Sequence, residues 1–255
     1  MGHRCYSREG ELKPDASIKE MREYGYLPTV TTIDSMLANP FLELWKRRGA
    51  VDAALDLTDE EKEGDRKEVI DRVLDIPRQI SIDAADRGTE IHRGAEDILE
   101  GRIWNQADPQ LQAVNEWVQA HITKVHYVER CLKNVKPGLG YAGTCDLKAD
   151  HDEYGTCLID WKSQNCKTGK NNKPRFNFYE IWPVQLAAYR EVEGRELPVV
   201  SVIIDKNSKA IKAKRWADEA VDRAFEAFKS LHHLWCWKNN YFPCGTADVL
   251  PSEIY

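Results

Sequence analysis

Two short stretches of this chain bring together residue types that could do chemistry on a phosphate ester. Asp146 ends the stretch Gly143-Thr144-Cys145-Asp146, and Asp160 follows fourteen residues later in Ile159-Asp160-Trp161-Lys162. We expect strands over residues 141–149 and 156–163, joined as one β-hairpin. Two carboxylates and a lysine on one hairpin are suited to holding a divalent cation against a phosphodiester.

The turn of this hairpin sets the expected register. A turn centred on Glu153 pairs position 146 with position 160, so Asp146 and Asp160 should be cross-strand partners on one face, with Cβ atoms about 4.5–5.5 Å apart. Carboxylates this close repel each other unless a cation lies between them, and Mg²⁺ or Mn²⁺ suits such oxygen ligands. The main-chain carbonyl of Trp161 could complete the metal shell. Lys162 could orient or deprotonate a water molecule, or neutralise the phosphorane. The alternative is an exposed hairpin with ordinary surface charges.

Further candidate ligands precede the hairpin. His92 and Glu96 are four residues apart on a helix expected from Ser81 to Gly101, so they share a face. His92 could be a further metal ligand, and Glu96 a ligand or the group that orients one. Alternatively, the two are a surface pair with a hydrogen bond along the helix. Glu129 lies in a strand-like stretch, where it could share the metal site or form an ion pair at the surface.

Candidate DNA contacts follow the hairpin. Gln185 and Tyr189 are four residues apart on a helix expected over residues 180–193, where they could hold phosphate oxygens or a base edge. The alternative is a half-buried polar pair. The stretch from Trp161 to Tyr179 contains basic residues and no acid, and four of them are candidate DNA contacts: Lys167, Lys170, Lys173 and Arg175.

These pieces, in this order, resemble the PD-(D/E)XK nuclease superfamily, in particular its RecB-like branch with phage exonucleases and the mitochondrial genome maintenance exonuclease. The resemblance spans about residues 27–190 and includes Leu27-Pro28-Thr29-Val30-Thr31-Thr32-Ile33. It implies that His92, Asp146 and Asp160 are metal ligands and that Lys162 is the catalytic lysine. It also implies that Gln185 and Tyr189 form a Q-x-x-x-Y motif that contacts DNA. Asp160 stands where the superfamily motif also allows Glu.

Composition limits the remaining function classes. The chain has 255 residues, 42% of them hydrophobic and 31% charged, with a net charge of −6, which argues against a nonspecific DNA coat protein. It has no apolar run long enough to span a membrane and no signal-peptide pattern at its N-terminus, so we expect a cytoplasmic protein of a bacterium or a phage-infected host. The seven cysteines include no CxxC pair, which disfavours an iron–sulfur cluster.

The expected fold class is α/β, with a restriction-endonuclease-like core. A central mixed β-sheet is flanked by helices and preceded by a helical N-terminal extension. Residues 1–26 are expected to be an arm, at most partly ordered, and residues 27–255 a single nuclease domain. Within that domain we expect a helical part over 27–125, the catalytic sheet core over 125–216 and a C-terminal helix over 217–240.

The leading functional hypothesis is an Mg²⁺/Mn²⁺-dependent DNA exonuclease, acting on single-stranded or duplex ends in phage-type recombination, replication or DNA processing. Partners would include DNA, a single-strand annealing or replication protein, and other copies of the chain. A structure- or sequence-specific endonuclease on the same fold and a non-catalytic DNA-binding module are the alternatives. Cleavage polarity, strand preference and the number of metal ions do not follow from the sequence.

Overall fold

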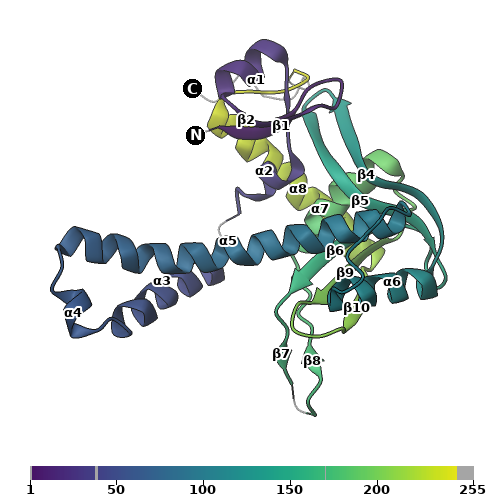
Figure 1. Cartoon of the computed structure of the whole chain (residues 1–255). Helices are drawn as coiled ribbons and strands as arrows, with labels where there is room; N and C mark the ends of the chain where they lie inside the picture. Colours follow the sequence, from purple (N-terminus) through teal and green to yellow (C-terminus); the bar gives the residue numbers. More distant parts are fainter. Residues whose placement is uncertain (1, 38–39, 170, 246–255) are drawn as a thin grey trace. The chain divides into compact units, whose positions relative to one another are not determined.

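The computed structural model describes residues 2–37, 40–169 and 171–245. The chain divides into two compact units, one formed by Met1–Leu37 with Gly94–Tyr255 and the other by Ala38–Arg93. The candidate hairpin belongs to the first unit. Figure 1 shows the chain coloured along its sequence.

A mixed sheet of five strands forms the centre of the first unit, in the order β10-β9-β6-β5-β4. Its strands are β4 (Ile122–Lys136), β5 (Leu139–His151), β6 (Gly155–Gln164), β9 (Val199–Asp205) and β10 (Ile211–Arg215). Strands β6 and β9 are parallel, and the other neighbours are antiparallel. The expected α/β class with a central mixed sheet flanked by helices is confirmed.

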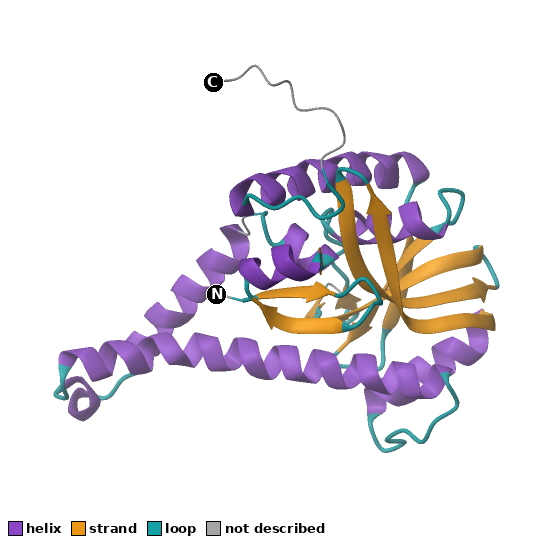
Figure 2. Cartoon of the chain, turned by 90° about the horizontal axis from the view of Figure 1, so that it is seen from above, coloured by secondary structure: helices purple, strands orange, loops and turns teal. Residues whose placement is uncertain are grey.

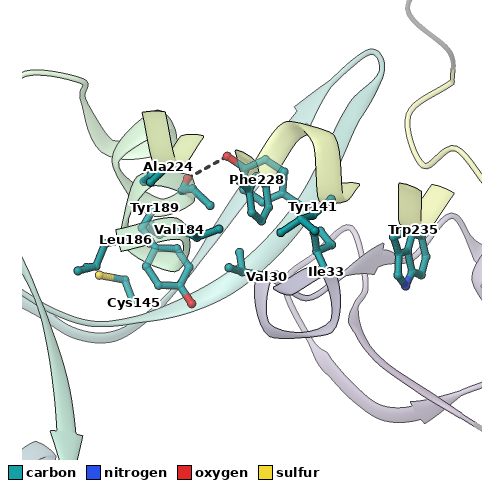
Figure 3. Packing of buried hydrophobic residues seen from close by; sticks show 14 of the residues in the cluster. Val30, Ile33, Tyr141, Cys145, Val184, Leu186, Tyr189, Ala224, Phe228 and Trp235 are labelled. Atoms are coloured by element: carbon teal, nitrogen blue, oxygen red, sulfur yellow. Dashed lines mark hydrogen bonds between the residues drawn. The ribbon is translucent and has the colours of Figure 1, made fainter. Parts of the chain in front are cut away.

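Helices flank this sheet on both faces, as Figure 2 shows. Helix α7 (Trp182–Glu193) contacts β4, β6 and β9 and packs against α8 (Asp218–Asn239), while α6 (Pro109–His121) contacts β4, β9 and β10. Figure 3 shows the core between α7, α8 and the sheet, where the Tyr141 hydroxyl donates to the Ala188 carbonyl at 2.9 Å. The other face of β6 carries Trp161, whose ring meets Trp117 of α6 edge-on at 5.3 Å.

Local sequence explains where the flanking helices begin and end. The side chain of Asp108 caps α6 by accepting hydrogen bonds from the backbone amides of Gln110 and Leu111. Pro109 occupies the first turn, where a backbone amide would have no partner within the helix. Asn240 ends α8 in a left-handed conformation with φ of 44°. Helix α8 lies within the C-terminal helix expected over residues 217–240.

The N-terminal residues, for which the sequence predicted an arm, form regular secondary structure. They form β1 (His3–Tyr6), β2 (Leu12–Ala16) and α1 (Ile18–Tyr24), followed by β3 (Leu27–Pro28) and α2 (Val30–Asp34). Strand β1 pairs with both β2 and β3, and the side chains of Cys5 and Met21 are fully buried. Burial of these side chains stabilises the segment, although its sequence is polar and weakly periodic.

Thr29 is the N-cap of α2. Its side chain accepts the hydrogen bond from the Thr32 amide. Thr29 has extended backbone angles, as an N-cap residue requires. The helix therefore begins at Val30 and reaches Asp34 within one and a half turns.

The second unit is helical, with α3 (Pro40–Leu55), α4 (Asp59–Lys62) and most of α5 (Arg66–Leu99), which continues into the first unit. We expected a new helix to start at Ser81, but α5 runs unbroken through Pro77. A Cβ on Gly49 of α3 would lie 3.2 Å from the Pro77 ring, so the two helices approach closely there. This packing compensates for the backbone hydrogen bond that proline cannot make.

Two further features complete the described part of the chain. Strands β7 (Lys167–Thr168) and β8 (Pro174–Arg175) form a two-stranded ribbon between β6 and α7. None of the described helices is both long and apolar enough to cross a membrane. The predicted single nuclease domain over residues 27–255 stays a prediction.

Candidate active site

The register of the central hairpin is the one that the sequence predicts. Strands β5 and β6 pair from Leu147 opposite Ile159 to His151 opposite Gly155, and Gly155 takes the positive φ of 68° that the turn requires. The same register, continued by one residue, sets Asp146 opposite Asp160. There the side chain of Asp146 takes part in joining the strands, because its Oδ2 accepts a 2.9 Å hydrogen bond from the Trp161 amide.

Glu129 supplies a third carboxylate, on the strand next to that of Asp146. Strand β4 pairs with β5 through Val128 opposite Leu147 and Arg130 opposite Cys145, so Glu129 between them stands opposite Asp146. Glu129 has a left-handed φ of 47°, which is uncommon for a residue with a side chain. Three neighbouring strands therefore present Glu129, Asp146 and Asp160 at one level of the sheet.

Lys162 forms an ion pair with Asp160, the most buried of these acids. Asp160 is only 2% exposed, and both of its oxygens lie 2.7 Å from Lys162 Nζ. The ammonium donates to Oδ1, and Oδ2 is in ion-pair contact with it but accepts no hydrogen bond among the described residues. Because Oδ2 has no hydrogen bond there, it is a candidate ligand for a further cation.

The charged groups of the site change one another's pKa. Burial raises the pKa of Asp146 well above 3.8, and the negative charge of Asp160 raises it further, against the opposing effect of Lys162. Burial would lower the pKa of Lys162, but the charges of Asp160 and Asp146 outweigh it, so that pKa is raised. Lys162 is therefore an ammonium ion at neutral pH, beside acids whose charges repel each other.

Glu129 and Glu96 extend the acidic region. The pKa of Glu129 is raised to about 7, first by burial of its carboxyl and then by the charge of Glu96. Asp160 adds to this increase, while Arg4 opposes it. Glu96 itself forms an ion pair with Arg102 at 2.6 Å. Glu129 thus faces the other acids, and Glu96 lies at the edge of the group with a cationic partner of its own.

The helix α7 supports Lys162 through a chain of hydrogen bonds. Lys162 Nζ donates to Gln185 Oε1 at 3.3 Å, and Gln185 Nε2 donates to the Tyr189 hydroxyl at 3.1 Å. Tyr189 is 2% exposed, and burial raises its pKa well above 10. In this arrangement both polar ends of Gln185 are engaged inside the protein. The DNA contacts predicted for Gln185 and Tyr189 stay predictions.

Gly143 leaves room for this chain of hydrogen bonds. A Cβ at position 143 would lie 2.8 Å from Tyr189 Cε1 and 3.0 Å from Val30 Cγ2. Real Cβ atoms do not approach other atoms as closely as the first of these distances, so only glycine lets α7 and α2 pack here. Packing against α7 and α2 thus explains why the Gly-x-x-Asp stretch has glycine at position 143, three residues before Asp146.

Asp34, at the end of α2, is a member of the site that the sequence analysis missed. Burial raises its pKa from 3.8 to about 7, while Lys162 opposes and Asp160 adds to the increase. Its Oδ1 is buried and has no hydrogen-bond partner within the described ranges. The sequence held one signal for this role. A carboxylate in the last turn of a helix interacts unfavourably with the helix dipole, so its presence there suggests a function other than stabilising the helix.

The remaining predicted residues fall into three groups. His92 lies on α5 within the second unit, and its role as a metal ligand stays a prediction, as does that of the Trp161 carbonyl. Lys167, Lys173 and Arg175 are exposed on the β7–β8 ribbon and its connecting turn. Lys170 lies outside the described residues.

Comparison with known proteins adds little to this geometry. No protein-family model matches the chain, and no curated protein matches it. Among solved structures, the chain is similar to a candidate exonuclease from Eubacterium rectale, with a TM-score of 0.39 and 14% identity. That similarity covers 65% of this chain and 76% of the other.

Proposed function

We propose that this chain is a divalent-metal-dependent deoxyribonuclease of the PD-(D/E)XK type, RecB-like branch, and that it removes nucleotides from DNA ends. The observation that carries the proposal is the meeting of Asp146, Asp160 and Lys162 on two neighbouring strands. Lys162 Nζ lies 2.7 Å from both oxygens of the buried Asp160, and burial together with the charge of Asp160 raises the pKa of Asp146.

The residues present fit a divalent cation. Asp146 and Asp160 offer carboxylate oxygens, which Mg²⁺ and Mn²⁺ prefer over nitrogen and sulfur. Glu129 stands in the same row and is a further candidate ligand. A divalent ion, when bound, supplies charge that acidifies a water molecule and stabilises the negative charge developing on the phosphate.

The chain's own groups provide the rest of the chemistry. Lys162 is charged at neutral pH and half-buried, so its ammonium can neutralise a phosphate oxygen as charge builds up in the transition state. This favours charge neutralisation over proton abstraction among the roles considered for Lys162. Gln185 fixes the position of Nζ, and buried Tyr189 fixes Gln185. The exposed cations of the β7–β8 ribbon are placed to attract the DNA backbone.

The test is digestion of end-labelled linear DNA and of covalently closed circular DNA, with Mg²⁺ and with Mn²⁺. Wild type is compared with Asp160→Asn, which keeps the shape of the side chain and removes its charge. Asp150→Asn is the matched control, since Asp150 lies on the same hairpin but bonds Thr156 and His126 instead. We expect loss of linear DNA with wild type and the control, and at least about a 100-fold slower loss with Asp160→Asn.

Other outcomes separate the alternatives. Equal cutting of circular DNA indicates an endonuclease at the same site. DNA binding without cleavage, together with no heat of Mn²⁺ binding in calorimetry, indicates a binding module. Unreduced cleavage by Asp160→Asn overturns the assignment of the site. A phage-type role in recombination or replication, in the cytoplasm and with other copies of the chain, remains part of the proposal.

A further inference from the structure

A second group of potential ligands lies at the opposite end of the same hairpin. His121, the last residue of α6, meets His151 and Asp152 at the β5–β6 turn, and one ligand atom of each lies within 4.8 Å of the others. Position 151 is five residues from Asp146 along β5, so this group is about 17 Å from the candidate active site. It takes no part in the proposed nuclease chemistry.

The spacing of the donor atoms is close to that of a metal shell. Asp152 Oδ1 lies 3.2 Å from His121 Nδ1 and 2.9 Å from His151 Nδ1. In a tetrahedral zinc shell with bonds of about 2.0–2.2 Å, neighbouring ligand atoms are about 3.3–3.5 Å apart. Both distances from Asp152 are slightly shorter than the edges of such a shell, and the ligand atoms of the two imidazoles lie within 4.8 Å of each other. His121 is 40% exposed, which leaves its ring room to turn.

The ring of His151 is incompletely satisfied by the protein. It is 4% exposed as a residue, and its Nδ1 accepts a hydrogen bond from the Glu153 amide at 3.1 Å. In this arrangement Nδ1 carries no proton, so it does not donate to the carboxylate oxygen of Asp152 that lies 2.9 Å away. The other nitrogen, Nε2, is buried without a hydrogen-bond partner among the described residues. A cation held by Nδ1 and Oδ1 would take the place of the Glu153 amide at the Nδ1 lone pair and would be attracted to the carboxylate.

Aromatic side chains hold the imidazoles in place. Trp117 contacts the rings of both His121 and His151, at 5.2 Å and 5.7 Å between centroids, and Tyr154 stacks on His151 at 4.3 Å. The backbone is fixed as well, since the Asp152 amide donates to the His121 carbonyl at 2.9 Å.

From this geometry we infer that His121, His151 and Asp152 form a structural site for a first-row transition metal ion of the zinc type. Two imidazoles and one carboxylate are borderline ligands that suit Zn²⁺, Co²⁺ and Ni²⁺ better than Mg²⁺. The ion would join the end of α6 to the turn of the hairpin that carries Asp146 and Asp160. The inference does not depend on the proposed nuclease function.

The experiment uses the full chain carrying Asp160→Asn, so that the candidate active site contributes little metal binding. Zn²⁺ and Co²⁺ are added separately, and stoichiometry is measured by calorimetry, Co²⁺ absorption in the visible range, and Tm by thermal unfolding. We expect one ion per chain, a visible Co²⁺ spectrum without a sulfur charge-transfer band, and a rise in Tm of about 5 °C at a hundredfold excess over Kd.

Two variants and one control identify the ligands. His121→Ala and Asp152→Asn are both at partly exposed positions, so they should fold, which far-ultraviolet circular dichroism checks. Each should weaken Zn²⁺ binding at least about tenfold and remove most of the rise in Tm. His126→Ala is the control, because His126 bonds Asp150 at 2.7 Å outside the cluster. Absence of Zn²⁺ and Co²⁺ binding, or unchanged binding in both variants, overturns the inference; a sulfur band would place the ion on cysteines and overturn it as well.

Discussion

The backbone amide of Trp161 donates a hydrogen bond to Asp146 Oδ2 at 2.9 Å, so the strand that carries Asp160 also fixes the carboxylate opposite it. This bond lies where the β5–β6 ladder ends, one residue beyond the pair Leu147–Ile159. The protein thus holds Asp146 in place although burial and the charge of Asp160 disfavour its ionised form.

Replacing Asp146 by Asn should separate activity from stability. The amide oxygen can still accept from Trp161, but the negative charge is gone. We expect nuclease activity to fall at least about 100-fold. Without metal near pH 8, the variant should be more stable than wild type, because a charge that the folded state disfavours has been removed. Addition of Mg²⁺ should raise the Tm of wild type and leave that of the variant unchanged. Equal Mg²⁺ stabilisation of both proteins would contradict a metal site at Asp146.

Asp34 should make stability fall with rising pH. Its pKa is about 7 in the folded chain against an ordinary 3.8, so the folded state holds this proton more tightly than the unfolded state. The free energy of unfolding should therefore decrease from about pH 4 to pH 7 and then level off. Asp34→Asn removes this contribution, and at about pH 8 we expect it to be about 1–2 kcal/mol more stable than wild type.

Urea denaturation at about pH 5 and about pH 8, with EDTA present, measures this effect. The control is Asp150→Asn, because hydrogen bonds from Thr156 and His126 lower the pKa of Asp150, and its contribution has the opposite sign. If the difference in stability between Asp34→Asn and wild type is the same at both pH values, the raised pKa of Asp34 is refuted.

Removing the Lys162 ammonium should leave Asp160 without its cation. Lys162→Met should lower activity at least about 100-fold and, without metal, destabilise the chain by about 2–3 kcal/mol. The double variant Lys162→Met with Asp160→Asn should recover most of that stability, because the buried charge has gone too. A double-mutant cycle by urea denaturation gives the coupling. A coupling near zero would mean that the 2.7 Å contact contributes nothing.

Gly143→Ala should act through packing alone. The added methyl group would overlap Tyr189 and press on Val30, both of which are buried, so we expect a loss of about 1–3 kcal/mol in the free energy of unfolding. Gly155→Ala is a useful comparison, since a Cβ there would meet nothing within 4 Å and only its positive φ opposes the change. If Gly143→Ala unfolds like wild type, α7 does not pack as closely as described.

Removing cations from the β7–β8 ribbon should change DNA affinity and not the chemical step. Lys167→Ala and Arg175→Ala should each raise KM for DNA, leave kcat within about twofold, and reduce the slope of log affinity against log salt by about 0.7–0.9. Lys229→Ala on α8, where Lys229 pairs with Glu226, is the control. An unchanged salt slope in both ribbon variants would show that the ribbon does not contact phosphates.

The hairpin was predictable because its geometry is local. A turn centred on Glu153 and strict alternation are enough to set the register of β5 against β6, and the observed pairs follow it. Glu129 could not be assigned in this way, since its place opposite Asp146 depends on the register of β4, which shifts near Val125 and Tyr127. The sequence therefore left both of its possible roles open.

The missed features depend on contacts between distant segments. Asp34 reaches the site because α2 packs on β5 and α7, and His121 meets His151 because α6 ends beside the hairpin turn. Both contacts join segments that are far apart in the sequence, so no regular spacing of residues along the chain predicts them. Strands β1 and β3 are similar cases, since they are short and are stabilised by each other and by buried Cys5 and Leu27.

The single parallel pairing among the five main strands determines how the chain connects Lys162 to Gln185. Because β6 and β9 run the same way, the chain must return across the sheet between them, and α7 makes that return. The β7–β8 ribbon is inserted in this return path, after Lys162 and before Gln185. The length and charge of the ribbon can therefore change by insertion or deletion while Lys162 and Gln185 keep their 3.3 Å contact, so the proposed DNA contacts can vary independently of the candidate active site.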